Sequence, residues 1–586
     1  MMRKIPVLWA LFFGVMALGV EYLPFSQVVP GMTGYGLTVV AGGEISRFQV
    51  EVVGVIDEPG TANDFIVIRA SGDAIKRSGG IAQGMSGSPI YLEGRLAGAL
   101  SRAALWAAEP EHPLGLVTPI EPMLAVLEEA RGAEGRLPPG VKEVRYVAAP
   151  PEELESSVLY ILPVHSPIMA TGLKEHALGY LRQGLDLEGF RLAPALMELM
   201  PFQHETLPGL EGLGVGRIVQ VSSPQTPSHT SPSFAPGMPL GVGLVVGDIT
   251  LGALGTVTLT DGDALVAFGH PFLFSGPVSF FLNSARILDT VAAYDAPFKL
   301  GTMGEVVGGI YVDRWAGIGG RVGDVPPGID MAFYVQDRSR MSSGKLSSTM
   351  VHEPRLEPLL LFISGLEATD RALDRIGPGT VTVSYTIQGK GMPRPLSRQN
   401  VFLSTRDVAV YVPLEAAIVT DILEYNEFQD PELTGIRITA SVSPELKAME
   451  VVDLVTDADS YAPGDTISFR VLLRTWRGEI QAWEGKLDIP EDLDAPYVEL
   501  RAYGGPRARE KGESPPVFHN LEDLIAYIED IPSFNTLTVE LFAPDPLSTV
   551  VGETRLRGID SLSDIVGEAV VYGQVSVYLP LEGSGW

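Results

Sequence analysis

Short apolar segments, broken repeatedly by glycine and proline, are the feature that most limits how this chain can fold. Residues 36–40, 48–55 and 65–69 alternate or run apolar over the length of one strand, with Gly or Pro between them. The 586-residue chain holds 65 Gly and 46 Pro, which favours tight turns over long helices. The sequence therefore predicts a mainly β protein, long enough for several domains.

The N-terminus has the pattern of a signal peptide. Arg3 and Lys4 precede an apolar run over residues 5–20 that ends in small residues. The run is short for a membrane-spanning helix, so retention as a membrane anchor is the alternative. We expect the chain outside the cytoplasmic membrane, secreted or in the periplasm or cell envelope.

Net charge and cysteine content exclude several classes of partner and chemistry. A formal net charge of −30 repels phosphate backbones, so we expect no nucleic acid partner. Because the chain has no cysteine, disulfides, thiol nucleophiles and cysteine–zinc sites are excluded. The spacing of His, Asp and Glu indicates no metal site, and we expect no cofactor.

Residues 84–89, Gly-Met-Ser-Gly-Ser-Pro, combine a hydroxyl with a backbone that can bind an anion. Glycines on both sides of Ser86 allow unusual φ values, which can expose Oγ and aim the N–H groups of Gly84 and Ser86 at one point. The loop therefore predicts the nucleophile and oxyanion hole of a serine peptidase. An α/β-hydrolase elbow is disfavoured, because Ser88 replaces the second glycine and a strand, not a helix, follows.

A serine nucleophile needs an imidazole base, and His270 is the candidate among eight histidines. The apolar strand 264–268 leads into Gly269-His270-Pro271, a tight turn that would fix the ring. An ordinary core or turn histidine is the alternative. The surrounding unit opens at 236–244 with a Pro-Gly-Met pattern that repeats 30–37, so we expect two similar β-barrels.

Residues 79–90, Gly-Gly-Ile-Ala-Gln-Gly-Met-Ser-Gly-Ser-Pro-Ile, closely resemble the stage IV sporulation protein B peptidase family, as does the preceding segment 44–53. Segment 264–270 is similar to the histidine motif of that family, which belongs to the trypsin-like serine peptidases. The resemblance implies a trypsin-like double β-barrel. The serine segment comes first here, so the catalytic domain looks circularly permuted. The family's PDZ module has no match between residues 131 and 235.

The resemblance also implies an acidic residue shortly before Gly-Gly-Ile. Asp73 is the counterpart when a small gap is allowed, and Asp64 is the alternative. A third carboxylate, Asp313, is expected to pair with a nearby arginine. The catalytic set predicted from the sequence is therefore Ser86, His270 and Asp73.

The chain is predicted to divide into six parts. These are a signal peptide (1–20), a serine-bearing β-barrel half (21–131), a mixed connector with a Ser/Thr/Pro linker (132–235), a histidine-bearing β-barrel half (236–345), a β-rich region (346–445) and an immunoglobulin-like β-sandwich (446–586).

These features predict an exported serine endopeptidase that cleaves a protein or peptide substrate, with the chain itself among the candidates. A membrane is a partner only if the N-terminal segment is retained. The alternative is a catalytically degenerate peptidase-fold scaffold that binds envelope or surface proteins. A third reading, suggested by the sandwich alone, is a carbohydrate-binding or cell-wall protein.

Overall fold

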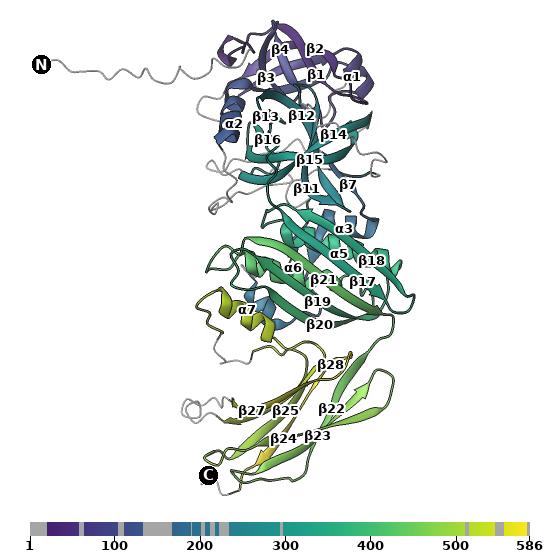
Figure 1. Ribbon diagram of the computed structural model, residues 1–586, viewed down its shortest axis with the longest axis vertical. Helices are drawn as coiled ribbons and strands as arrows, with labels where there is room; N and C mark the ends of the chain where they lie inside the picture. The colour runs from purple at the N-terminus through teal and green to yellow at the C-terminus, as the bar shows by residue number, and fades with distance from the viewer. Residues whose placement is uncertain are drawn as a thin grey trace, which may run out of the picture. The chain divides into compact units, whose positions relative to one another are not determined.

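The computed structural model describes residues 20–57, 64–103, 111–132, 167–188, 190–200, 206–210, 217–221, 234–293, 297–509, 515–544 and 556–582. Strands account for 51% and helices for 16%, which confirms the mainly β prediction (Figure 1). The predicted signal peptide and most of the predicted connector lie outside the described residues. Within the described residues, no helix is long and apolar enough to span a membrane.

The chain forms two compact units. The first comprises residues 1–184, 208–328 and 348–353, and the second comprises 185–207, 329–347 and 354–586.

The first unit opens with a closed six-stranded antiparallel barrel of strand order β1-β2-β3-β6-β5-β4. Alternate residues of β2, including Phe48, Val50 and Val52, point into its core. The strands are β1 (Thr33–Thr38), β2 (Ser46–Ile56), β3 (Phe65–Ser71), β4 (Pro89–Leu92), β5 (Arg95–Ala103) and β6 (Leu114–Pro119).

A second barrel in the same unit has the order β11-β12-β13-β16-β15-β14, closed because β11 pairs with both β12 and β14. Numbered within each barrel, both orders are 1-2-3-6-5-4. The expected pair of similar, trypsin-like barrels is therefore confirmed. The strands are β11 (Pro239–Gly247), β12 (Thr250–Asp261), β13 (Ala264–Ala267), β14 (Gly276–Val291), β15 (Phe298–Arg314) and β16 (Gly317–Val322).

Helix α2 (Ile120–Gly132) follows the first barrel, where the sequence predicts a helix over 120–131. Its buried apolar residues pack in one cluster with Ala99 of the first barrel and Val266 of the second. A Cβ added at Gly319 would lie 2.9 Å from Ala130 Cβ, so β16 and the helix are in close contact. The helix therefore helps to join the two barrels.

The remaining elements before β11 lie outside the strands of the two barrels and span three to nine residues each. They are η1 (Phe25–Gln27), α1 (Asp73–Ser78), β7 (Ile168–Thr171), α3 (Glu175–Gln183), β8 (Gly184–Asp186), α4 (Pro194–Leu199), β9 (Thr206–Pro208) and β10 (Ile218–Gln220).

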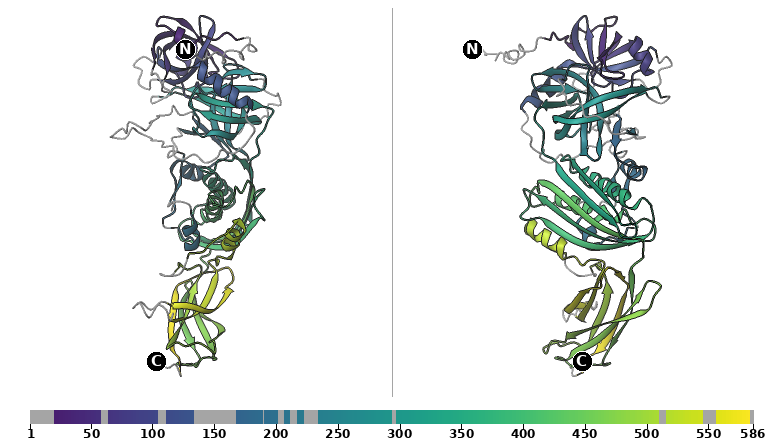
Figure 2. Two further views of the ribbon diagram at one scale, coloured as in Figure 1. Left: turned by 90° about the vertical axis from the view of Figure 1, so that its left-hand side faces the viewer. Right: turned by 45° about the vertical axis from the view of Figure 1, so that its right-hand side comes forward.

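The second unit begins with strands in the order β18-β17-β21-β19-β20, covered on one face by two helices (Figure 2). Because β17 pairs with β21, the histidine-bearing barrel ends at Val322, before the predicted boundary at 345. The elements are β17 (Ile329–Asp337), β18 (Ser342–Met350), α5 (Glu357–Leu373), β19 (Gly379–Gly389), β20 (Leu396–Ser404), α6 (Tyr411–Glu424) and β21 (Leu433–Ser443).

The chain ends in a sandwich of two four-stranded sheets, β24-β23-β22-β28 and β27-β26-β25-β29, which share one apolar core. A β-sandwich is the fold expected for this region, and its immunoglobulin-like type over residues 446–586 stays a prediction. Its elements are β22 (Ala448–Thr456), β23 (Thr466–Thr475), β24 (Ile480–Asp488), β25 (Tyr497–Gly504), α7 (Leu521–Asp530), β26 (Thr536–Pro544), β27 (Leu556–Ile565), β28 (Val570–Tyr572) and β29 (Gln574–Pro580).

Candidate active site

Ser86 lies in the loop between the third and fourth strands of the first barrel, after α1 and before β4. Gly84 has φ +87° and Gly87 has φ +90°, values in the left-handed region that favours glycine. The backbone conformation therefore favours glycine at both positions that flank the serine, as the sequence indicates.

Gly87 also leaves no space for a side chain. A Cβ at this position would lie 1.9 Å from the Thr256 carbonyl oxygen and 2.5 Å from the Phe268 amide nitrogen. Ser86 is thus bonded to a residue that touches the backbone of the second barrel, two residues before His270.

We expect Gly87→Ala to destabilise the first unit by about 2–4 kcal/mol, because strain at positive φ adds to a backbone clash. Thermal unfolding of the full chain measures the effect. Gly43→Ala is the control: Gly43 has nothing within 4 Å of the added Cβ, so its melting temperature should stay unchanged. Equal melting temperatures for the two variants would contradict the close packing at Gly87.

The backbone around Ser86 is held in a form that suits an oxyanion hole. The peptide before Gly84 has its carbonyl oxygen bonded to the Lys299 N–H at 2.9 Å. The peptide before Ser86 has its carbonyl oxygen bonded to the N–H and hydroxyl of Ser88, at 3.0 and 2.6 Å. Because N–H and C=O point in opposite directions in a trans peptide, these bonds orient both predicted oxyanion donors.

His270 occupies the same place in the second barrel that Ser86 occupies in the first, between the third and fourth strands. The turn before it runs through Phe268 at φ +71° and Gly269 at φ +68°. A positive φ is unusual for phenylalanine, and such strain is typical of functional sites.

Both loops are attached to the same strand, β5. Leu100 exchanges backbone hydrogen bonds with the serine loop, accepting from Gly87 N–H at 2.8 Å and donating to Ser88 O at 2.9 Å. A Cβ added at Gly269 would lie 3.1 and 3.3 Å from the Cβ atoms of Ala99 and Ser101, on either side of Leu100. The structure therefore brings the serine loop and the histidine turn together.

Two threonines of β12 bind the serine loop from the second barrel, and neither is among the site residues predicted from the sequence. Thr256 donates its N–H to Ser86 O and its hydroxyl to Gly84 O, both at 2.9 Å. Thr258 donates its hydroxyl to Gly87 O at 2.8 Å. A sequence signal exists, since alternate threonines in the apolar strand 255–259 would share one face.

The site is more enclosed than the sequence suggests. Ser86 is 7% exposed and His270 is 2% exposed, whereas the glycine-flanked loop was expected to leave the hydroxyl in the open. The reason is tertiary packing, because β5 and β12 both bind this loop. That packing cannot be read from the loop itself.

A backbone carbonyl orients the histidine ring. His270 Nδ1 lies 2.7 Å from the Pro271 carbonyl oxygen. A carbonyl oxygen only accepts hydrogen bonds, so the neutral ring carries its proton on Nδ1 and its lone pair on Nε2. This is the tautomer that a general base beside a serine requires.

The two carboxylates proposed as the catalytic acid lie in the first barrel. Asp73 is the first residue of α1 and is exposed, while Asp64 is half-buried just before β3. His270 is buried, so its exposure differs from that of both candidate acids. The assignment of the acid to Asp73 stays a prediction.

Asp313, at the end of β15, holds the segment that follows His270. Its carboxylate accepts backbone N–H bonds from Phe272 and Leu273 at 2.7 Å and from Ser275 at 3.3 Å. The prediction that Asp313 pairs with a nearby arginine is wrong, because the adjacent Arg314 pairs with Glu129. Asp313 is completely buried, and desolvation raises its pKa to about 6 despite the backbone donors.

This carboxyl should make stability depend on pH. The pKa of Asp313 rises from 3.8 to about 6 on folding, so its protonated form stabilises the folded state. This contribution to the free energy of unfolding is complete below pH 4 and is lost as pH rises through 6. We expect the unfolding free energy of the wild type, relative to Asp313→Asn, to fall by about 3 kcal/mol over this range. A pH-independent difference between the two proteins would contradict the shift.

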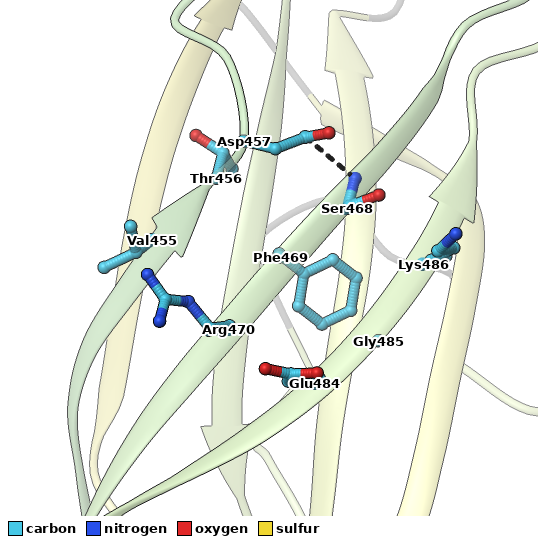
Figure 3. A pocket seen from close by; sticks show the side chains of 9 residues that line it. All are labelled: Val455, Thr456, Asp457, Ser468, Phe469, Arg470, Glu484, Gly485 and Lys486. Atoms are coloured by element: carbon cyan, nitrogen blue, oxygen red, sulfur yellow. Dashed lines mark hydrogen bonds between the residues drawn. The ribbon is translucent and has the colours of Figure 1, made fainter.

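A separate hollow of about 380 Å³ lies in the sandwich of the second unit (Figure 3). Its lining comes from β22, β23 and β24 and includes Arg470, Glu484 and Lys486. Asp457 stands at its edge and accepts the Ser468 N–H at 3.0 Å. None of its residues belongs to the serine site, and its mixed charges select no ligand class.

Residues 24–124 match the family model of the SpoIVB peptidase S55 family. This part of the chain is similar to that family, and the match covers less than half of the chain. The matched residues cover the first barrel and include Ser86, which confirms the resemblance of the serine half. The histidine half lies outside the match, so the circular permutation stays a prediction. No curated protein and no solved structure matches the chain.

Proposed function

We propose that the chain is an exported serine endopeptidase. Ser86 attacks the peptide carbonyl, His270 Nε2 acts as general base and then as general acid, and the N–H groups of Gly84 and Ser86 bind the oxyanion. The observation that carries the proposal is the S55 family match across the loop that bears Ser86. The contacts of this loop with the His270 turn support the pairing of the two residues.

Labelling of the full chain with a fluorophosphonate tests the nucleophile. We expect one labelled residue, identified as Ser86 by mass spectrometry, and no label on Ser86→Ala. His270→Gln should slow labelling strongly, because the hydroxyl then lacks its base. Label that persists on Ser86→Ala would refute the assignment.

Asp73 remains the proposed acid, with the role of orienting His270. Asp73→Asn should lower kcat at least about 10-fold with little change in KM, and Asp64→Asn serves as the matched control. Equal activity of both variants would contradict the role of Asp73, and the Pro271 carbonyl would then be the group that orients His270. The proposed substrate is a protein or peptide, since peptidases act on these.

Export is proposed from the segment 1–20, in which Arg3 and Lys4 precede an apolar run. Expression of the full chain, followed by fractionation and N-terminal sequencing, tests this proposal. We expect the chain outside the cytoplasmic membrane. Recovery in the cytoplasm would refute it.

A non-catalytic scaffold is the second candidate, and the enclosure of the site favours it. With Ser86 7% and His270 2% exposed, a peptide has little direct access to either side chain. A scaffold predicts that the folded protein takes up no fluorophosphonate, whereas a peptidase predicts uptake at Ser86. The same experiment therefore separates the two functions.

A further inference from the structure

Lys299, the second residue of strand β15, is completely buried, yet the proposed chemistry does not use it. Its Nζ donates to two hydroxyl oxygens, Thr38 Oγ1 at 2.9 Å and Thr256 Oγ1 at 3.0 Å. Among the described residues, no carboxylate lies within ion-pair distance of this amine. A buried amine without an opposite charge is costly, so its presence calls for a reason beyond packing.

Lys299 contacts the serine loop in two ways. Its backbone N–H donates to Gln83 O at 2.9 Å, and its side chain lies against Gly84, where an added Cβ would be 3.2 Å from Lys299 Cβ. Lys299 is also linked to the Gly84 carbonyl oxygen through Thr256, because the Thr256 hydroxyl accepts from Lys299 Nζ and donates to Gly84 O at 2.9 Å. One buried lysine thus contacts the loop that forms the predicted oxyanion hole.

The charge of the amine decides which way the Thr256 hydroxyl points. An ammonium group has donors only, so Thr256 Oγ1 must accept from Nζ and is left to donate to Gly84 O. A neutral amine has a lone pair and can accept the threonine proton instead. Gly84 O would then lose its hydrogen bond, and the backbone between Gly84 and Ser86 would be less firmly held.

We propose that the Lys299 ammonium is a positioning residue for the oxyanion loop, which it holds through the Thr256 hydroxyl. The inference rests on the proposed serine peptidase function and assigns a further residue to it. The neutral form of Lys299 leaves the loop loosened and the enzyme slow.

The surroundings of the amine support a change of charge near neutral pH. Burial lowers the pKa of Lys299 to about 7. The groups that face it are uncharged: Thr38 on β1, Thr256 on β12, and Thr290, its register partner on β14. The charged side chains nearby face elsewhere, since Asp289 pairs with Arg77 and Arg217 lies over the ring of Phe298.

The rate of fluorophosphonate labelling of Ser86, measured on the full chain, tests the proposal without a known substrate. Lys299→Met keeps the apolar stem and removes the amine, and Thr256→Val removes the hydroxyl at similar volume. We expect each to slow labelling by about 10- to 100-fold, less than the loss of an oxyanion donor itself. Thr290→Val is the matched control, because among the described residues its hydroxyl donates to Val40 O and not to the serine loop; its rate should match the wild type.

The pH profile separates positioning from a merely structural role. In the wild type, labelling should decline as pH rises from 7 to 9, because Lys299 loses its proton, and the decline should be absent in Thr256→Val. A wild-type rate that keeps rising to pH 9, or a folded Thr256→Val with the wild-type rate, would overturn the inference. Label on Ser86→Ala would instead refute the proposed function, so the two failures are distinguishable.

Discussion

Replacing Ser86 by alanine is expected to lower kcat for cleavage of a fluorescently labelled protein substrate by about 10⁴-fold or more, with KM little changed. The hydroxyl forms a bond to the substrate only in the reaction, so its loss removes transition-state stabilisation and leaves ground-state binding intact. His270→Gln should have a similar effect, because the serine is a weak nucleophile without its base.

The double variant gives the sharper result. Residues that act as one catalytic unit are strongly non-additive, so Ser86→Ala/His270→Gln should be no slower than the slower single variant. His112→Gln is the control, since His112 is exposed in the same unit, and its kcat should equal that of the wild type. Multiplicative losses in the double variant would show that Ser86 and His270 act independently, which the proposed mechanism does not allow.

The equivalent positions of Ser86 and His270 explain why chain order need not matter to this site. Each lies between the third and fourth strands of a barrel with the strand order 1-2-3-6-5-4. Exchanging the order of two such barrels along the chain leaves each loop in place on its own barrel. A catalytic group depends on geometry and not on sequence order, so a permuted arrangement can assemble the same site.

Local patterns in the sequence were sufficient for the parts of the site that depend on local structure. Ser86 is marked by Gly84 and Gly87, whose positive φ values favour glycine, and His270 by the turn at the end of an apolar strand. The repeated Pro-Gly-Met openings predicted two similar barrels. In each case the physical cause lies within a few residues of the signal.

The supporting residues could not be found in this way, because their contacts join distant segments. Thr256 reaches Ser86 across 170 positions, and Lys299 reaches Thr38 across 261. Nothing near Asp313 in the sequence shows that three backbone N–H groups from the His270 turn would surround it. Only the packing of the barrels brings these groups together.

The helices of the second unit were missed for a different reason. The region 346–445 was predicted as β-rich, yet α5 and α6 lie within it. Nearly every residue of both helices is buried, so their apolar residues do not mark one face. Without a helical period, a buried helix and a buried strand cannot be told apart from the sequence.

A buried ion pair in this second unit carries the largest expected effect on stability. Arg398 on β20 donates Nε to Glu415 of α6 at 2.6 Å, and both residues are almost completely buried. Asn400 and Tyr385 donate to the same carboxylate at 2.6 and 3.0 Å. Arg398 also donates to the carbonyl oxygen of Ile531, just after α7, so one network joins the sheet to two helices.

Glu415→Gln should destabilise the second unit by about 3–5 kcal/mol, because it leaves the Arg398 charge buried without a counter-charge. Calorimetry of the full chain measures this as a lower melting temperature for one transition. Arg394→Met is the matched control: Arg394 is partly exposed and pairs with Glu522 and Glu529, so its loss should cost less than about 1 kcal/mol.

The apolar double variant Arg398→Met/Glu415→Leu separates the cost of an unpaired charge from the worth of the pair. Removing both charges leaves neither one buried alone, so the double variant should be more stable than Glu415→Gln.

Fluorophosphonate labelling of Ser86 in Glu415→Gln should keep the wild-type rate at temperatures where the second unit has melted, since the serine loop and the His270 turn both belong to the first unit. A labelling rate that falls with the melting of the second unit would show that the site depends on it.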